Sequence, residues 1–343
     1  IPFIARYRKE VTGSLNDEQL RALSERLVYL RNLEEKKASV LATIEEQGKL
    51  TDELKKQIEA VMTMVALEDL YRPYRPKRRT RATIAKEKGL EPLAEILRAQ
   101  ATTRTIEEEA TAFVDAEKGV ESVQDAIDGA KDILAEVYAD DADYRTKLRA
   151  MTKESGSLVA KAKDEEADSV YEMYYDFSEP IKKLVGHRIL AINRGEAEKF
   201  LTVKIEAPRQ EILLWLVKQI IGNMKHDSAS YLYEAITDSY DRLIAPSIER
   251  EIRNELTEKA EEGAIGVFGK NLHQLLMQPP ISGQVVLGWD PGFAHGSKLA
   301  VVDETGKVLD TVIIYPTKGQ KNYDAAKQVL KKLIAKYHVT LIS

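Results

Sequence analysis

The sequence predicts a mainly α, multi-helical protein that ends in an α/β segment. From residue 16 to about residue 277, apolar side chains recur three and four positions apart, and polar capping residues precede several of these runs. That pattern is typical of amphipathic helices. After Gly283 it gives way to short apolar runs separated by turns that contain glycine, which indicates strands. With 343 residues, the chain is long enough for more than one hydrophobic core.

We expect three regions along the chain. An N-terminal helical region with a basic loop covers residues 1–140, and a second helical region with a long spine helix covers 141–283. The start of the α/β domain covers 284–343, and we expect that domain to be incomplete because Leu341 and Ile342 look like the beginning of a further strand. Since the chain opens with Ile1 rather than Met, we also expect it to be a fragment.

The first long helix should begin at Asn16 or Asp17, which can cap it. One stripe of its side chains is expected to face a partner helix: Leu20, Leu23, Leu27 and Leu30. Gly48 should end this arm, and Thr51 with Asp52 should start the next. The apolar residues expected to be buried on that second arm are Leu54, Ile58, Val61 and Val65.

Proline and capping signals organise the middle of the chain. Pro73 and Pro76 predict an extended stretch, whereas Pro92 marks the first turn of a short helix. Ser122 with Asp125 predicts the start of another amphipathic helix. The pattern then loosens, with a β-like run at 201–207. Residues 238–276 carry a long helical period, and we expect this spine helix to pack against several neighbours.

The last sixty residues read as strands at 285–289, 298–303 and 308–315, followed by a helix over 323–336. Asp303 is expected to be a turn residue between the second and third strands. Asp290 ends the first strand just before a turn that contains Gly292 and Gly296. This is how an RNase H-like nuclease sheet begins, and a carboxylate there can hold Mg²⁺.

Asp290 also has a plainer interpretation, because an aspartate before Pro-Gly is a common turn residue. A two-metal site needs several carboxylates, and this chain supplies one credible ligand. We therefore assign no catalytic residue and no metal ligand beyond the weak candidate Asp290. No cofactor is expected, apart from Mg²⁺ if the protein were a nuclease.

Charge is strongly segregated despite a net value of −5. Residues 71–88 contain eight Lys or Arg and one acid, whereas residues 105–143 contain thirteen Asp or Glu and two Lys. The run YRPYRPKRRTR at 71–81 is the best candidate for contacts to a nucleic-acid backbone. Its candidate phosphate-binding residues are Arg72, Arg75, Lys77, Arg78, Arg79 and Arg81. The alternative is a solvated loop, or one that docks on the acidic region.

The sequence does not support a disulfide-bonded, zinc-binding, nucleotide-hydrolysing or membrane-spanning protein. The absence of cysteine excludes disulfides and thiolate metal sites and fits a reducing cytoplasm. The five histidines show no helical metal spacing, and there is no phosphate-binding GxxxxGK[ST] loop. No apolar run reaches the length of a membrane span. We therefore expect a cytoplasmic protein without a membrane partner.

Several long strings resemble the Tex family of bacterial transcription accessory proteins. They are IPFIARYRKEVTG, EDLYRPYRPKRRTRATIAKEKGLEPLA, HRILAINRGE, RLIAPSIEREIRNELTEKAE and VLGWDPGF. The resemblance spans the chain. It implies a helical N-terminal region and a YqgF domain of RNase H-like fold beginning near residue 284. It also implies RNA or DNA as partners, a role in transcription, and further RNA-binding modules after Ser343.

The chain departs from the family at the turn after Asp290. It has Ala294, His295 and Ser297 where Arg, Thr and Cys are usual. An arginine there would be a phosphate contact or an ion-pair partner, so its loss argues against an active nuclease site.

The leading hypothesis is a non-enzymatic scaffold that binds nucleic acid in transcription through the basic loop. A Mg²⁺-dependent nuclease of the RuvC/YqgF type that uses Asp290 is one alternative. A protein-protein adaptor that uses the acidic helices to bind the transcription machinery is another.

Overall fold

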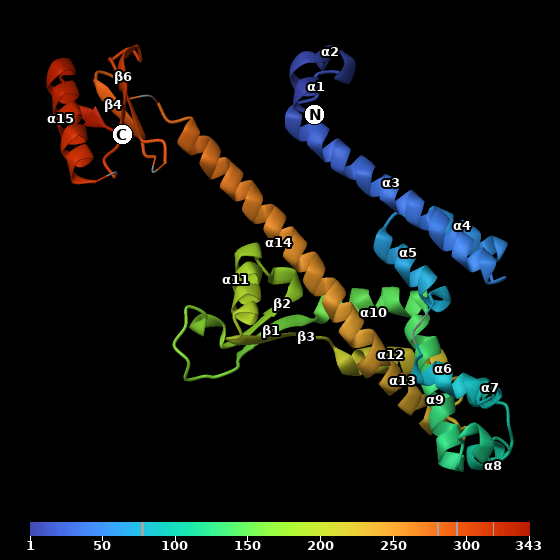
Figure 1. Cartoon of the computed structure of the whole chain (residues 1–343). Helices are drawn as coiled ribbons and strands as arrows, with labels where there is room; N and C mark the ends of the chain where they lie inside the picture. The colour runs from blue at the N-terminus through green and yellow to red at the C-terminus, as the bar shows by residue number, and fades with distance from the viewer. Residues whose placement is uncertain (77–78, 280, 293, 318) are drawn as a thin grey trace. The chain divides into compact units, whose positions relative to one another are not determined.

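The computed structural model describes residues 1–76, 79–279, 281–292, 294–317 and 319–343. The chain divides into two compact units, Ile1–Ile265 and Gly266–Ser343, which are described separately (Figure 1). The protein is mostly helical, with a small mixed sheet near its C-terminal end. The predicted fold class is therefore confirmed. Within the described residues, no helix combines the length and the apolar character needed to cross a membrane.

Five helices begin the first unit: α1 (Pro2–Tyr7), α2 (Lys9–Thr12), α3 (Asp17–Glu46), α4 (Asp52–Ala60) and α5 (Met64–Tyr71). Asn16 caps α3 through a reciprocal capping box with Gln19, and Thr51 caps α4, as predicted. Gly48 follows α3 in the left-handed region with φ +66°. The helices enclose a core of their own, formed by Leu33, Val40, Ile44, Leu54, Ile58 and Leu67.

Two of the predictions for these helices are wrong. Leu23 and Leu27 are 58% and 45% exposed, so no helix among the described residues covers the middle part of the leucine stripe. The buried face of α3 lies instead further along the helix, at Leu33, Val40 and Ile44, where α4 and α5 pack on it. Val65 is also exposed, because the second arm ends at Ala60 and Val65 belongs to α5.

Helices α6 to α10 form the centre of the first unit. Their bounds are α6 (Arg81–Glu87), α7 (Glu91–Ala99), α8 (Ile106–Thr111), α9 (Val123–Asp140) and α10 (Ala142–Ser155), with a 3₁₀ turn at η2 (Ala116–Lys118). Helix α9 is the central element, because it contacts α6, α7, α8 and α13. Its start at Ser122, with the Asp125 capping box, and the Pro92 turn of α7 agree with the predictions.

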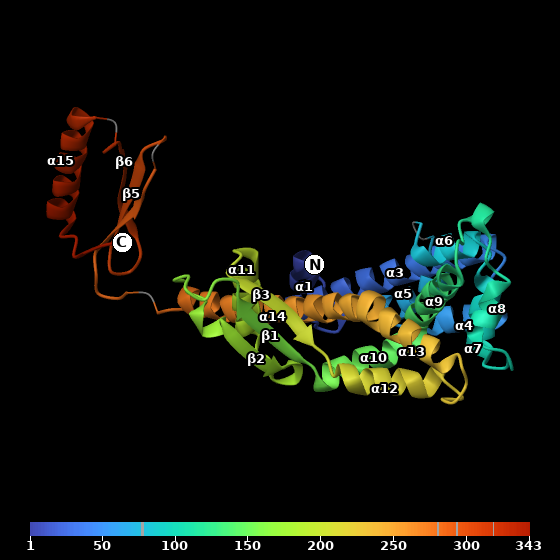
Figure 2. The ribbon, with the colours of Figure 1, turned by 90° about the horizontal axis from the view of Figure 1, so that it is seen from below.

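A three-stranded antiparallel sheet follows, in the order β2-β1-β3. Its elements are β1 (Ser157–Ala162), η3 (Glu172–Tyr174), β2 (Asp176–Pro180), η4 (Ile181–Lys183), α11 (Gly186–Ala197) and β3 (Leu201–Glu206). Helix α11 packs on β3, and Figure 2 shows the sheet and this helix together. Of the three strands, only β3 was predicted. The pattern of β1 is unclear because three successive residues, 158–160, are buried, so it does not alternate.

The first unit closes with α12 (Arg209–Ile220), α13 (Ala229–Asp238), a π-helical turn η5 (Ser239–Ile244) and the first part of α14 (Ala245–Leu276). Up to Ala260, α14 buries Ser247, Ile248 and Ile252. From residue 261 to its end, every residue of α14 is exposed. The long helix is therefore confirmed, but its second half packs against no neighbour among the described residues, contrary to the prediction.

The second unit contains β4 (Val286–Asp290), β5 (Ser297–Val302), β6 (Val308–Ile314), α15 (Gln320–Tyr337) and β7 (Leu341–Ile342). The sheet order is β6-β5-β4-β7; the first two pairings are antiparallel, and β4 pairs with β7 in parallel. Ala326 and Leu333 of α15 join the core on one face of the sheet. These elements match the predicted strands and helix. Asp303 accepts backbone hydrogen bonds from Thr305 and Lys307, as expected of a turn residue.

Candidate nucleic-acid interface

The basic run connects α5 to α6. The run follows the end of α5, a helix that Thr63 caps at its start, and it leads into the start of α6, which Thr80 caps. Both ends of the run are therefore anchored in helices. Between them, Arg72–Tyr74 form a 3₁₀ turn, η1, and the predicted extended conformation is wrong for these residues. Pro73 fits the turn because its fixed φ suits the first positions of a helix. Lys77 and Arg78, both predicted to bind phosphate, lie outside the described residues.

The four described arginines of the run differ in exposure. The side chains of Arg75, Arg79 and Arg81 are 66%, 70% and 66% exposed, whereas Arg72 is 34% exposed. Each also has an acidic neighbour. Arg79 lies 3.1 Å from Glu87, and Arg75 lies 3.9 Å from Glu68. Such exposed pairs are weak, so these side chains remain able to exchange an acid for a phosphate.

Two of the arginines face the acidic segment 105–143. Nε of Arg72 lies 3.5 Å from Asp140, and Nη1 of Arg81 lies 4.0 Å from Asp132. Burial, and next the nearby Arg145 guanidinium, lower the pKa of Arg72 from its usual value. Arg72 therefore belongs to the internal charge network more than to the surface. Of the four described arginines of the run, Arg75, Arg79 and Arg81 are the most accessible.

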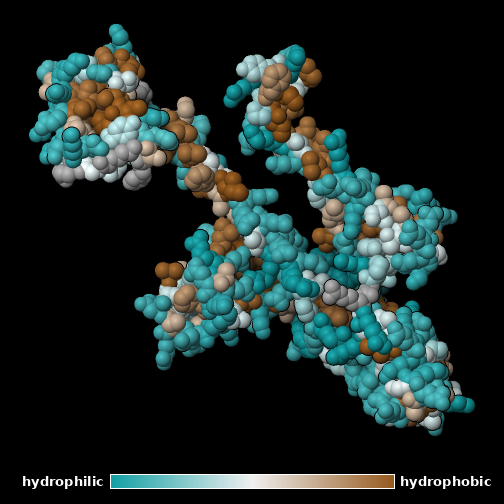
Figure 3. All heavy atoms as spheres, viewed as in Figure 1, coloured by the Kyte–Doolittle hydropathy of each residue, from teal (hydrophilic) through white to brown (hydrophobic). Residues whose placement is uncertain are grey.

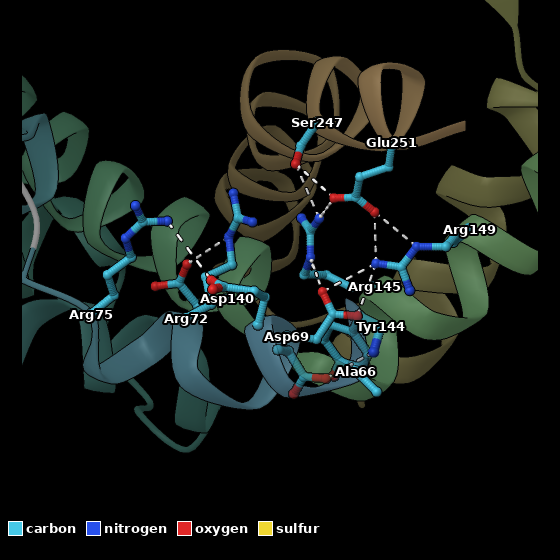
Figure 4. A network of polar contacts seen from close by, with 12 residues as sticks. Ala66, Asp69, Arg72, Arg75, Asp140, Tyr144, Arg145, Arg149, Ser247 and Glu251 are labelled. Carbon is cyan, nitrogen blue, oxygen red and sulfur yellow. Dashed lines mark hydrogen bonds and ion pairs between the residues drawn. The ribbon is translucent and has the colours of Figure 1, made fainter. Parts of the chain in front are cut away.

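Behind the run, a buried ionic network fixes α5 against α10 and α14 (Figure 4). Arg145 donates from Nε to Asp69 at 2.8 Å and from Nη2 to Glu251 at 2.6 Å and Ser247 at 3.1 Å. Arg149 donates to the same two carboxylates, at 2.8 Å in each case. Burial acts to raise the pKa of Glu251, but Arg145 and Arg149 outweigh it, so that pKa is lowered.

Sequence reasoning missed this network. Asp69 follows Glu68 between Leu67 and Leu70 in an otherwise apolar helical segment, and a carboxylate in such a segment is the signal that could have indicated a buried partner. The network positions the basic run because Asp69 lies three residues before Arg72 on the same helical stretch.

Asp290 is exposed at the end of β4, and its Cα is paired with that of Lys298 on β5. The turn that follows is compact. A Cβ added to Gly292 would collide with the Gly296 carbonyl oxygen, and one added to Gly296 would lie 2.6 Å from the Tyr315 ring. Gly296 also has φ +82°, a conformation that favours glycine. These two glycines therefore hold the backbone of the turn in place beside Asp290.

A cavity of about 920 Å³ lies over the sheet of the second unit and includes Asp290, Lys298 and Thr311 in its lining. The residues on this face are small at the centre, where Gly288 and Ala300 are paired. Apolar side chains gather on this unit and along the exposed part of α14 (Figure 3). Over the described ranges, no three Asp, Glu, His or Cys side chains group closely enough to hold a metal ion, so Asp290 belongs to no such group there.

Three family models match the chain. The model of the Tex-like protein N-terminal domain matches residues 1–45, that of the Tex central region matches 101–268, and that of the Tex protein YqgF-like domain matches 284–343. Together they cover the helical body and the α/β end.

Proteins from distant organisms are similar over the whole chain. YdcI of Bacillus subtilis is 47% identical over 346 residues, and the transcriptional accessory protein Tex of Neisseria gonorrhoeae is 42% identical over 351. The human S1 RNA-binding domain-containing protein 1 is 32% identical over 357 residues. All of this chain is covered in each case, but only 48%, 45% and 35% of these relatives. The chain thus spans about half the length of the bacterial relatives.

Proposed function

The chain belongs to the Tex family, and we propose that it serves as a non-enzymatic, nucleic-acid-binding part of a transcription accessory factor. The observation that carries this proposal is the cationic run 71–81, which presents Arg75, Arg79 and Arg81 to solvent. The names of the relatives support it, since one is a transcriptional accessory protein and another has an S1 RNA-binding domain.

The run suits a phosphate backbone for two reasons. Arginine offers a planar fork of donors that matches phosphate oxygens, and three exposed guanidinium groups lie within seven residues. The α5 and α6 helices hold both ends of the run, so binding does not require ordering of a free tail. Contacts of this kind bind RNA or DNA without reading sequence.

Fluorescence anisotropy with a labelled single-stranded RNA and a labelled duplex DNA tests the proposal. The variant carries Arg75→Glu, Arg79→Glu and Arg81→Glu. We expect weaker binding to every sequence, and a plot of log affinity against log salt that is flatter by about 0.9 per lost contact on DNA and about 0.7 on RNA.

The matched control carries the same charge change at three exposed lysines of the α3–α4 turn and α4, Lys49→Glu, Lys55→Glu and Lys56→Glu. It should bind almost like the wild type. If the two triple variants lose affinity equally, binding follows total charge and the assignment to the run is wrong.

We also propose that proteins of the transcription machinery bind this chain, on the strength of the relatives' names and of the acidic segment 105–143. The test is binding to purified RNA polymerase after nuclease treatment. Replacement of the exposed Glu117 and Glu121 by Gln should weaken that binding. Unchanged binding by this variant would argue against the acidic segment as the contact.

A Mg²⁺-dependent nuclease is the second candidate. It is favoured by the position of Asp290, exposed at the end of β4 beside the 920 Å³ cavity, and by the match to a YqgF-like domain. There Asp290 would hold Mg²⁺, which would supply a Lewis acid for the phosphate and lower the pKa of a bound water. Mg²⁺-dependent cleavage of a branched or linear DNA that disappears in Asp290→Asn would establish this function.

A further inference from the structure

The outer side of α15, in the second unit, carries a group of lysines that the function proposed above does not use. The opposite side of the helix packs on the sheet through Ala326 and Leu333 (Figure 1). Four lysines of the helix are exposed and lie away from that packed side. We call them the lysine face: Lys321, Lys327, Lys331 and Lys332.

The spacing of these lysines places them in two short rows. Lys327 and Lys331 are four positions apart, which is about one helical turn, and Lys321 and Lys332 are eleven apart, which is about three turns. At about 1.5 Å per residue, the four span roughly 16 Å of helix. One strand of a duplex has a phosphate about every 3.4 Å along the axis, so this length matches four or five phosphates.

Little negative charge balances the lysine face. Residues 311–343 contain six lysines and one acid, Asp324, so this segment has a charge of +5 in a chain whose net charge is −5. Among the described residues, no carboxylate lies within ion-pair distance of any lysine of the face. Lys336 on the same helix differs, because its ammonium lies 3.5 Å from Asp310.

Helix α4 shows the more usual arrangement of exposed lysines. It also carries two of them, Lys55 and Lys56, but its nine residues include three acids, Asp52, Glu53 and Glu59. The charges of that surface therefore nearly cancel, whereas the lysine face produces a positive field. A clustered positive field on one face is the electrostatic footprint of a polyanion partner.

An exposed aromatic side chain gives a second, independent indication. Tyr323 is 48% exposed and precedes Lys327 by four positions, so the two are neighbours on the helix surface. Exposed aromatic rings beside a cationic surface stack on the bases of single-stranded nucleic acids. The combination of Tyr323 with the lysines therefore favours a nucleic acid over an acidic protein surface, which offers no bases to stack.

We propose that the lysine face and Tyr323 form a second nucleic-acid contact surface, one that favours single strands. This inference rests on the nucleic-acid binding proposed above and adds a site on the other compact unit. The ammonium groups of the lysines bind phosphate oxygens, and Tyr323 stacks on a base beside them.

Fluorescence anisotropy of the whole chain with a labelled single-stranded RNA and a labelled duplex DNA tests the lysines. The α15 variant carries Lys327→Gln, Lys331→Gln and Lys332→Gln. We expect its affinity for the RNA to fall about tenfold or more at low salt. The plot of log affinity against log salt should be flatter by about 2, because each contact to a single strand contributes about 0.7.

The matched control removes the same three charges from exposed lysines that lie among acids, Lys49→Gln, Lys55→Gln and Lys56→Gln. It should bind almost like the wild type. The proposal is overturned if the α15 variant binds the RNA as tightly as this control does. An α15 variant that loses binding to purified RNA polymerase but keeps its RNA affinity would identify an acidic protein as the partner, and would also overturn it.

Tyr323→Ala tests the stacking contact separately from charge. It should lower affinity for the single-stranded RNA about fivefold or more and leave affinity for the duplex DNA almost unchanged, because paired bases offer no free face to the ring. An equal effect on both ligands, or none on the RNA, would contradict the preference for single strands.

The arginine variant of the run 71–81 separates this inference from the proposed function. Weaker binding in that variant alone supports the run and overturns the lysine face. Weaker binding in the α15 variant alone supports the lysine face and makes the assignment to the run wrong. Weaker binding in both supports two contact surfaces.

Discussion

Arg145 and Asp69 form an ion pair in which both partners are buried, with side chains 0% and 5% exposed and an Nε to Oδ1 distance of 2.8 Å. The pair connects α10 to α5, and Arg145 also reaches Glu251 on α14. The N-terminal helices, which have their own small core, are thereby tied to the central core through buried charge. One guanidinium nitrogen of Arg145, Nη1, is buried and has no hydrogen-bond partner among the described residues, so the network leaves one of its donors unsatisfied there.

Asp69→Asn should destabilise the protein by about 3 kcal/mol, because it leaves two buried arginines with one carboxylate between them. Urea unfolding followed by circular dichroism measures the change. The control is Glu255→Gln, which breaks an exposed ion pair with Lys153 and should cost less than about 1 kcal/mol. Equal effects of the two substitutions would mean that the buried pair contributes no more than a surface pair.

The Glu251 carboxylate should make stability depend on pH in the acid range. Its pKa is lowered in the folded state from an ordinary 4.5, so the unfolded chain takes up the proton first as pH falls. The stability from this group is present at neutral pH and is lost as pH falls through the folded-state pKa. The wild type should therefore exceed Glu251→Gln in unfolding free energy at pH 7, and the gap should narrow below about pH 4.5. A gap that is constant from pH 7 to pH 3 would contradict this.

Asp132→Asn should strengthen nucleic-acid binding a few-fold at low salt. Asp132 lies 4.0 Å from Arg81 and 3.4 Å from Arg242, so its charge competes with a phosphate for the Arg81 guanidinium. The control Asp128→Asn makes the same charge change on the same helix, but Asp128 pairs with Lys131 at 2.7 Å. Anisotropy titrations should show a larger gain for Asp132→Asn, and the difference should shrink as salt rises. Equal gains would indicate a general charge effect.

Gly296→Ala should destabilise the second unit by about 3 kcal/mol. Gly306→Ala is the matched control, because Gly306 has φ +86° but open space around it, so that substitution should cost only about 1 kcal/mol. The fluorescence of Trp289 reports on this unit once the other tryptophan is replaced, in a Trp215→Phe background. Equal losses of unfolding free energy in Gly296→Ala and Gly306→Ala would contradict tight packing around Gly296.

The sequence was informative wherever structure depends on neighbours in the chain. Asn16 and Ser122 marked helix starts because a cap bonds to residues three positions away. The strands around Asp290 were readable because apolar runs and glycine turns alternate there. The wrong predictions concern tertiary packing. Leu23 and Leu27 have the spacing of a buried stripe, yet both remain exposed.

The candidate site was predictable only in part, for a related reason. The arginine and lysine content of residues 71–81 identifies the basic run in the sequence. Its acidic partners Asp132 and Asp140 lie far away in the sequence, and only folding brings them near it. Arg145 and its carboxylates lie 76 and 106 residues apart in sequence. No local pattern encodes contacts of such separation.

The exposed half of α14 has a consequence for the order in which the protein loses structure. From residue 261 on, the helix gains nothing from burial, and Gly263, Gly266 and Gly269 each weaken it by about 1 kcal/mol relative to alanine. A helical stretch of this length is marginal in water by itself. Its amide protons should therefore exchange with solvent orders of magnitude faster than those before Ala260, where Ile248 and Ile252 hold the same helix in the core.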